Sequence, residues 1–180
     1  MPKVTSIEPQ KKNLLFEIMV GKLMERMYRL FNIRQRSEKE VRDYLRNLSL
    51  KRKMKGQEEI SASAIELLVN KLKQKRLLSD EEFARAWIEA RRRSKKKGKI
   101  ALKQELFQKG INRDLIEKVL KDSTPESEEQ LAQQALVKRC LRWKNLAEME
   151  KKKKAFEFLL RKGFEYDIVR DTVEKIMEKR

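Results

Sequence analysis

The sequence predicts an all-α protein of about nine helices, arranged as three tandem three-helix repeats in a curved, elongated array. Apolar residues recur at helical spacing along most of the chain. Serines stand three residues before acids at several expected helix starts. Two stretches also match each other at an offset of 53 residues. We expect each repeat to bury an incomplete face, which stacking against its neighbour completes.

The first repeat is expected at residues 14–77, after a short N-terminal arm at residues 1–13. Between Leu14 and Phe31 the apolar residues fall near one helical face, which predicts the first helix. A serine followed three residues later by an acid forms a capping box and predicts a helix start. Three pairs have this form: Ser37 with Glu40, Ser63 with Glu66, and Ser79 with Glu82.

The second and third repeats are expected at residues 78–123 and 124–180, where the offset of 53 aligns apolar positions. The matching pairs include Leu106 with Leu159, Phe107 with Leu160, Ile116 with Val169, Leu120 with Val173, Phe83 with Leu136 and Ile88 with Leu141. A fainter copy upstream places Val41 and Leu45 at the positions of Leu102 and Leu106. These matches therefore predict three repeats of three helices each.

Gly110 and Gly163 occupy equivalent positions in the two clear repeats. Each follows a lysine at the end of an expected helix and precedes an apolar residue. This pattern is typical of a helix C-cap in the left-handed region, where glycine has no steric penalty. We therefore interpret both glycines, like the capping serines, as structural residues.

Forty-six Lys and Arg residues against 28 Asp and Glu give a net charge of +18. A charge of this size implies a polyanion or an acidic protein surface as partner. The lone Cys140 and the absence of histidine exclude a disulfide framework and a Cys-His zinc site, and suit a reducing cytosol. No phosphate-binding glycine loop and no run of about 18 apolar residues occurs. The sequence thus predicts no enzyme, cofactor, metal or membrane span.

A basic run at residues 91–99 holds the main candidate site. Arg91 lies four residues after Trp87, on the stripe that we expect to be buried, so its stem should cover the core. The remaining cations are predicted to form a basic face that binds phosphates or an acidic groove: Arg92, Arg93, Lys96, Lys97 and Lys99. The alternative is a solvated helix end whose cations offset the helix macrodipole.

Secondary candidates for the same contact are Arg34, Arg36, Lys151 and Lys152. Four consecutive lysines sweep all sides of a helix, so a solvated face is the alternative for Lys151–Lys154. Trp87 could stack on a base, but its place on the apolar stripe favours the core.

Four segments resemble the RecX recombination regulators: RQRSEKEVRDYL (34–45), LKQKRLLSDEEFARAWIEAR (72–91), KGKIALKQELFQKGI (97–111) and FEFLLRKGF (156–164). The resemblance implies a nine-helix protein of three repeats, without catalytic residues. It implies a bacterial cytosolic regulator that binds the filament of RecA recombinase on single-stranded DNA during recombination, repair and the SOS response. There the family restrains filament growth, ATP hydrolysis and strand exchange.

Residues 4–13 resemble the opening of a small β-rich segment in longer family members, but they run straight into the helix expected at Leu14. Two functions remain open. One is a filament regulator, which we expect to be a monomer with weak, sequence-indifferent binding of single-stranded DNA. The other is a plain basic module that coats nucleic acid through its phosphates.

Overall fold

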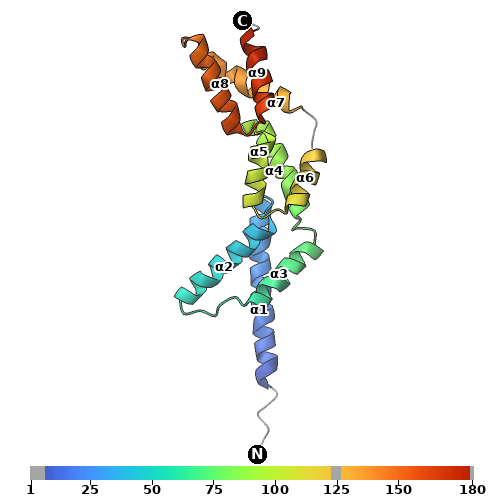
Figure 1. The fold of residues 1–180 in the computed structure, drawn as a ribbon. Coiled ribbons are helices and arrows are strands. Elements are labelled where there is room, and N and C mark those ends of the chain that lie inside the picture. The colour runs from blue at the N-terminus through green and yellow to red at the C-terminus, as the bar shows by residue number, and fades with distance from the viewer. Residues whose placement is uncertain (1–6, 123–126, 179–180) are drawn as a thin grey trace, which may run out of the picture. The chain divides into compact units, whose positions relative to one another are not determined.

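The protein folds into helices, and in the computed structural model they cover most of the described residues, 7–122 and 127–178. No strand occurs in these two ranges. The chain divides into two compact units, residues 1–80 and 81–180 (Figure 1). The all-α class predicted from the sequence is confirmed.

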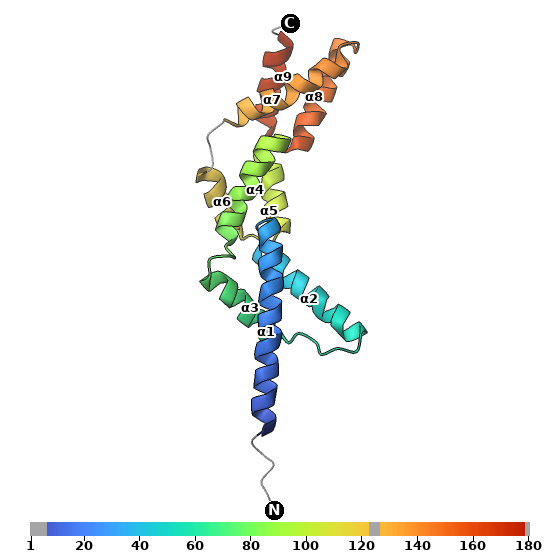
Figure 2. The ribbon, with the colours of Figure 1, turned by 180° about the vertical axis from the view of Figure 1, so that it is seen from behind.

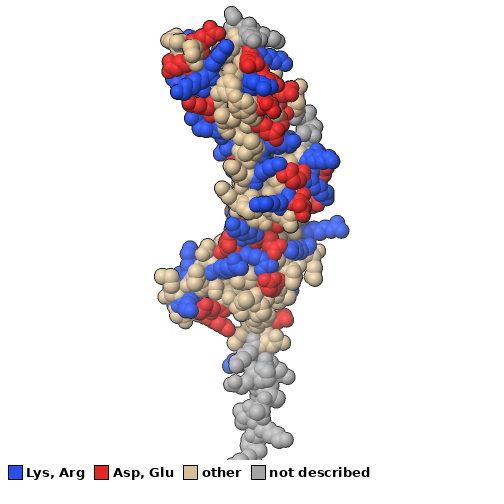
Figure 3. All heavy atoms as spheres, viewed as in Figure 1, with Lys and Arg blue, Asp and Glu red and all other residues tan. Residues whose placement is uncertain are grey.

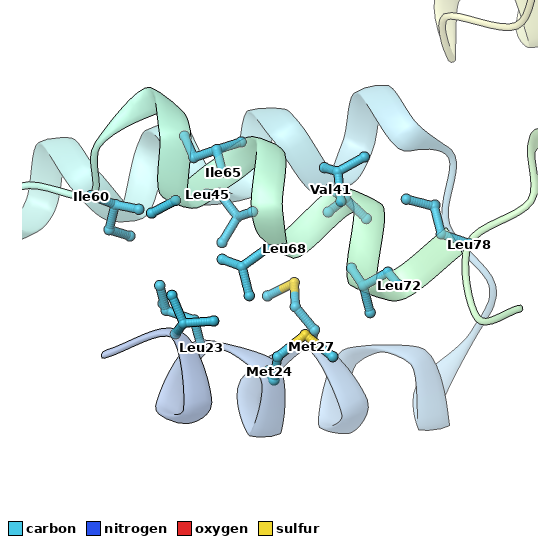
Figure 4. Close-up of a cluster of buried hydrophobic side chains, with 13 residues drawn as sticks. Leu23, Met24, Met27, Val41, Leu45, Ile60, Ile65, Leu68, Leu72 and Leu78 are labelled. Carbon is cyan, nitrogen blue, oxygen red and sulfur yellow. The ribbon is translucent and has the colours of Figure 1, made fainter. Parts of the chain in front are cut away.

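The first unit contains α1 (Ile7–Ile33), α2 (Glu38–Met54) and α3 (Ala62–Gln74). Helices α2 and α3 lie on the same side of α1, as the two opposite views of the ribbon show (Figure 2). Buried side chains of α1 point toward those of the other two helices (Figure 4). The core includes Leu23, Met24, Met27, Val41, Leu45, Ile65, Leu68 and Leu72.

The helix starts in this unit follow polar caps, with two differences from the sequence patterns. The Ser37 hydroxyl accepts the N–H of Glu40 at 3.2 Å and caps α2. Helix α3 is capped by Ser61, which accepts from Ala64 N–H, so the predicted cap at Ser63 is wrong. Helix α1 begins at Ile7, earlier than the expected start at Leu14, so part of the predicted arm is helical.

The second unit contains two clusters of three helices, each with its own core. The first cluster is α4 (Asp80–Lys95), α5 (Lys99–Gln108) and α6 (Arg113–Asp122), and Ser79 immediately precedes α4. The second is α7 (Glu128–Cys140), α8 (Glu148–Lys162) and α9 (Tyr166–Glu178), with a short 3₁₀ turn, η1 (Leu141–Trp143), after α7. Equivalent residues such as Leu106 and Leu159 are fully buried in the two cores.

The alignment of the two clear repeats fails in one helix. Ile88 is buried, but its predicted counterpart Leu141 is 53% exposed, so this pairing is wrong. Cys140 occupies the buried position instead. The offset is therefore 52 for Ile88 and Cys140 but 53 for Leu106 and Leu159, so the third repeat has one more residue between these two buried positions.

Gly110 and Gly163 both adopt left-handed backbone conformations, with φ of 81° and 82°. Gly163 ends α8, and its N–H bonds to the Leu160 carbonyl at 2.9 Å. Gly110 makes the same bond to Phe107 at 2.9 Å. A side chain at such a φ is strained, which explains glycine at both helix ends.

Candidate functional site: a basic groove in the second unit

The basic run divides between buried or half-buried ion pairs and an open surface. The Arg91 guanidinium lies 4.2 Å from the centre of the Trp87 ring, and its Nε donates to Glu105 at 2.8 Å. Lys97 Nζ lies 3.5 Å from the same carboxylate. Arg91 thus covers the core, as the register of α4 predicts, and Lys97 is a second cation held by Glu105.

Glu105 is the centre of this network and also accepts the Trp87 indole N–H at 2.9 Å. Burial alone would raise the pKa of Glu105, but the Trp87 hydrogen bond and the charges of Arg91 and Lys97 hold this pKa below its ordinary value. The carboxylate is therefore charged at neutral pH, and the cations around it are partly neutralised.

Arg92 is buried, with 7% of its surface exposed, so the expectation that it belongs to an exposed basic face is wrong. Its guanidinium donates to Glu128 at 2.9 Å, and the other oxygen of that carboxylate accepts the backbone N–H of Lys99 at 3.1 Å. Arg92 lies four residues after the buried Ile88 and so shares its face. The counter-charge comes from the start of α7, far along the chain.

Around this ion pair the backbones of two helix ends meet directly. Gly98 N–H donates to the Lys162 carbonyl and Ile100 N–H to the Gly163 carbonyl, both at 2.9 Å. A Cβ on Gly98 would lie 2.4 Å from the Gly163 oxygen, so only glycine fits there. The C-terminus of α8 thereby supplies acceptors to the free N–H groups that begin α5. We call these contacts, with the Arg92–Glu128 pair, the junction.

Beside the junction lies a groove of about 1110 Å³, which we call the basic groove. It is bounded by the end of α4, by α7 with η1, and by α8. Its cations are Arg93, Lys95, Lys96, Lys138, Arg139, Arg142 and Lys162. The other lining residues are Ser94, Gln130, Gln133, Gln134, Ala135, Val137 and Phe158. Seven cations therefore line the groove without a carboxylate.

Most groove cations also lack an internal counter-ion. Within the described ranges, Lys95, Lys138 and Arg142 form no ion pair, and Arg93 makes only an exposed contact of 3.6 Å with Glu89. On the face shown in Figure 3, Lys and Arg lie beside Asp and Glu over much of the surface. The basic groove thus concentrates positive charge, whereas the face shown in Figure 3 carries charges of both signs.

Phe158 lines the groove, and two cations lie over its ring. Lys162 Nζ and the Arg139 guanidinium lie 5.4 and 5.3 Å from the centre of its ring. Burial lowers the pKa of Lys162, and the positive charges of Lys97, Arg139 and Lys95 lower it further. Since like charges already oppose one another here, a bound anion would relieve this repulsion.

The other sequence candidates lie outside the basic groove. Arg34 makes a bidentate ion pair with Glu40, at 2.9 and 3.1 Å, and Arg36 is half-buried in the first unit. Lys151, half-buried, and Lys152, exposed, belong to α8 but not to the groove lining. Lys99 is half-buried, and its backbone N–H bonds to Glu128. Of the predicted basic face, Arg93 and Lys96 line the groove.

Sequence reasoning missed the groove residues supplied by the third repeat: Lys138, Arg139, Arg142 and Lys162. The spacing of Lys138 and Arg142, four residues apart, would place them on one face of a continuing helix. Nothing local indicates that this face meets the end of α4. In the part of the chain that the structure describes, no cluster of potential ligands could hold a metal ion and no helix could span a membrane.

Comparison with known proteins points to one family. The model of the second three-helix domain of RecX matches residues 79–120, and that of the third matches residues 126–173. Together the two matches cover half of the chain. The basic groove lies within these two domains, since its lining residues run from Arg93 to Lys162.

Two relatives called "Regulatory protein RecX" are similar in sequence to this chain, and to a comparable degree. The protein of Bacillus velezensis is 32% identical over 156 residues, which span 87% of this chain and 56% of the relative. The protein of Bacillus subtilis is 30% identical over 157 residues, which again span 87% of this chain and 56% of the relative. The chain therefore spans little more than half the length of these relatives.

Two solved structures share the fold. The crystal structure of RecX from Lactobacillus salivarius has a TM-score of 0.72 and 25% identity, covering 89% of this chain and 97% of that one. A crystal structure of regulatory protein RecX has a TM-score of 0.71 and 23% identity, covering 100% of this chain and 81% of that one. The part of the chain that the structure describes thus shares its fold with two solved proteins.

Proposed function

The chain belongs to the RecX family, and we propose from this premise that it regulates the RecA recombinase. It binds the filament that RecA forms on single-stranded DNA and restrains ATP hydrolysis, filament growth and strand exchange in DNA recombination and repair. The observation that carries the proposal is the basic groove, which gathers seven cations without a carboxylate. The protein acts as a monomer in the bacterial cytoplasm.

The groove suits this role because a nucleoprotein filament presents phosphates and acidic side chains along an extended surface. The cations Arg93, Lys138 and Arg142 are exposed on three different structural elements, so they can reach several anions at once. Long cationic side chains adapt to phosphates without reading a base sequence. We therefore expect weak binding of single-stranded DNA, indifferent to sequence and steeply dependent on salt.

The contribution to regulation is binding, not covalent chemistry. A ligand shifts an equilibrium only by its different affinity for the two states. We propose that the groove binds the assembled filament more tightly than free RecA, because several subunits and the DNA then present anions together. A bound copy holds the filament in a state that exchanges subunits and hydrolyses ATP slowly.

The same groove also favours a second function, a basic module that coats nucleic acid through phosphates. The two functions differ in stoichiometry. A coating protein must approach saturation of the strand before it changes what happens there, whereas a filament regulator acts when it is far outnumbered by RecA.

The test is the ATPase activity of RecA on single-stranded DNA, titrated with the protein at constant RecA and DNA. We expect inhibition at ratios well below one copy per RecA subunit. A parallel titration with excess free single-stranded DNA separates the two functions, because a coating protein loses its effect when the extra strand absorbs it. Inhibition that needs enough protein to cover all the DNA, or no inhibition, would reject the regulator function.

A further inference from the structure

A second groove lies in the first unit, between α1 and α2, and we call it the α1–α2 groove. Its volume is about 590 Å³, within the range of protein sites that take a ligand or side chains. Apolar side chains of both helices line it: Leu15, Ile18, Met19, Leu23 and Leu48. None of the residues that line the α1–α2 groove is aromatic.

Cations surround this apolar surface at helical spacing. Ile18, Lys22 and Arg26 are spaced four residues apart along α1. Lys51 near the end of α2 and Lys55 at its C-cap have the same spacing. Arg52 is the fifth cation, and Glu58 the one carboxylate among the lining residues. The α1–α2 groove therefore combines an apolar floor with a positively charged rim.

Part of the floor is open to solvent. Leu15 is 55% exposed and Ile18 46%, and the adjacent Leu14 is exposed as well. Further along α1, Leu23 and Met27 are buried in the core that α1 forms with α2 and α3. The apolar stripe of α1 thus extends beyond the part that the core of the described residues covers. Contiguous exposed apolar residues rimmed by polar ones are typical of a binding surface.

The two arginines of the rim are held by hydrogen bonds within the first unit, and its three lysines form no ion pair with a described carboxylate. Arg52 Nε donates to the Glu58 backbone carbonyl at 2.7 Å, and the Arg26 guanidinium bonds to the Tyr44 hydroxyl. Lys22, Lys51 and Lys55 form no ion pair with any described carboxylate. The charge on this rim is consequently available to acids of another molecule.

We infer that the α1–α2 groove docks an acidic amphipathic helix of a partner protein. Such a helix lays apolar residues spaced three and four apart on the floor, while its flanking Asp and Glu residues pair with the lysines of the rim. Charge complementarity selects this occupant: the rim carries five cations and one carboxylate.

Two other occupants fit less well. A single strand of nucleic acid would stack its bases on aromatic side chains, which this floor lacks. A second copy of the chain would bring together two molecules of net charge +18, which repel each other. The basic groove of the second unit differs in kind, since glutamines and cations dominate its lining. This docking site is independent of the proposed function.

The probe is a fluorescent synthetic helix with leucines at three- and four-residue spacing and glutamates on both flanks. A matched peptide replaces every glutamate by lysine. Fluorescence anisotropy with the full chain should show saturable binding of the acidic helix and none of the basic one. Hydrogen exchange should then show added protection in α1 and α2 around the groove.

Variants locate the site. Lys51→Glu with Lys55→Glu should weaken the acidic helix at least about tenfold, because like charges then face each other. The matched control, Lys152→Glu with Lys153→Glu on α8, makes the same change of charge elsewhere and should bind as wild type. Ile18→Ser should also weaken binding of the acidic helix. Because Ile18 is 46% exposed, the melting temperature of this variant should stay close to that of wild type.

Three results would overturn the inference. The first is equal binding of the acidic and basic helices. The second is an equal loss of affinity in the α2 and α8 charge-reversal variants, since this would mean attraction to the overall positive charge. The third is a preference for vesicles of phosphatidylcholine and phosphatidylserine, with α1 protected by vesicles and not by the peptide, which would make the groove a membrane surface.

Discussion

The junction and the basic groove draw cations from the same nine-residue run, yet the two regions use them differently. Arg92 is buried and pairs with Glu128 at 2.9 Å, whereas the next residue, Arg93, is exposed and lies 3.6 Å from Glu89. The difference lies in the surroundings: α7 brings a carboxylate to Arg92, and the groove lining offers none to its cations. A run of like charges thus divides according to which residues meet a carboxylate from another helix.

This comparison separates stability from binding. The junction holds two repeats together through a buried ion pair and direct hydrogen bonds between backbones. The groove cations are mostly exposed and form few internal contacts. Substitutions in the junction should therefore lower the free energy of unfolding, and substitutions in the groove should lower affinity for the filament.

The largest effect on stability is expected from Arg92→Ala. Removing one partner of a buried ion pair leaves the other charge uncompensated and costs about 3–5 kcal/mol. Chemical denaturation measures this loss, and Arg93→Ala is the control, for which we expect a change within about 0.5 kcal/mol. Equal stabilities of the two variants would mean that the distinction between buried and exposed cations is wrong.

A somewhat smaller loss of unfolding free energy is expected from Gly163→Ala. Gly163 has a φ of 82°, and its added Cβ would lie 2.3 Å from the backbone nitrogen of Ala101. Strain and overlap together should cost about 2–5 kcal/mol. Gly56→Ala is the matched control, because Gly56 has a φ of 67° with nothing within 4 Å of the added Cβ. It should lose only about 1 kcal/mol, by thermal melting.

A smaller loss of unfolding free energy, which depends on pH, is expected when Glu105 is replaced. Its folded-state pKa lies below the ordinary 4.5, so its stabilising contribution is present above that value and disappears as pH falls through the folded pKa. Glu105→Gln should cost about 1 kcal/mol at neutral pH. The difference in unfolding free energy between variant and wild type should shrink in acid. A difference that stays constant from neutral to strongly acid pH would contradict this role.

Local patterns predicted much of the fold because helices and their ends are determined by nearby residues. The cap at Ser37 and the left-handed C-caps at Gly110 and Gly163 lie where their motifs place them. The repeat also pairs buried residues such as Leu120 and Val173. The pairing of Ile88 with Leu141 failed because the third repeat has one more residue between its buried positions Cys140 and Leu159 than the second has between Ile88 and Leu106, which a single offset cannot represent.

The candidate site was predicted only in part, since it is formed by residues distant in sequence. Helix register correctly indicated that Arg91 covers the core, and the same rule applied from Ile88 would have indicated burial of Arg92. Its partner Glu128 lies 36 residues further along the chain. Likewise, Lys138 and Arg142 belong to the site only because α7 and η1 line the same groove as the end of α4.

The smallest effect on stability, and the largest on binding, is expected when the groove loses charge. The variant is Arg93→Gln, Lys95→Gln, Lys138→Gln and Arg142→Gln, and all four residues are exposed. Because surface substitutions of this kind change stability little, its melting temperature should stay near that of wild type. The matched control removes four exposed cations outside the groove, by Lys152→Gln, Lys153→Gln, Arg161→Gln and Lys175→Gln.

The most direct measurement is the affinity of these two variants and of wild type for RecA filaments on single-stranded DNA, across a series of salt concentrations. We expect the groove variant to bind and inhibit more weakly, with a salt slope flattened by up to about 0.7 for each phosphate that the groove no longer neutralises. The control variant should remain close to wild type. If instead both variants lose affinity equally, or the groove variant binds as wild type at every salt concentration, the basic groove is not the surface that meets the filament.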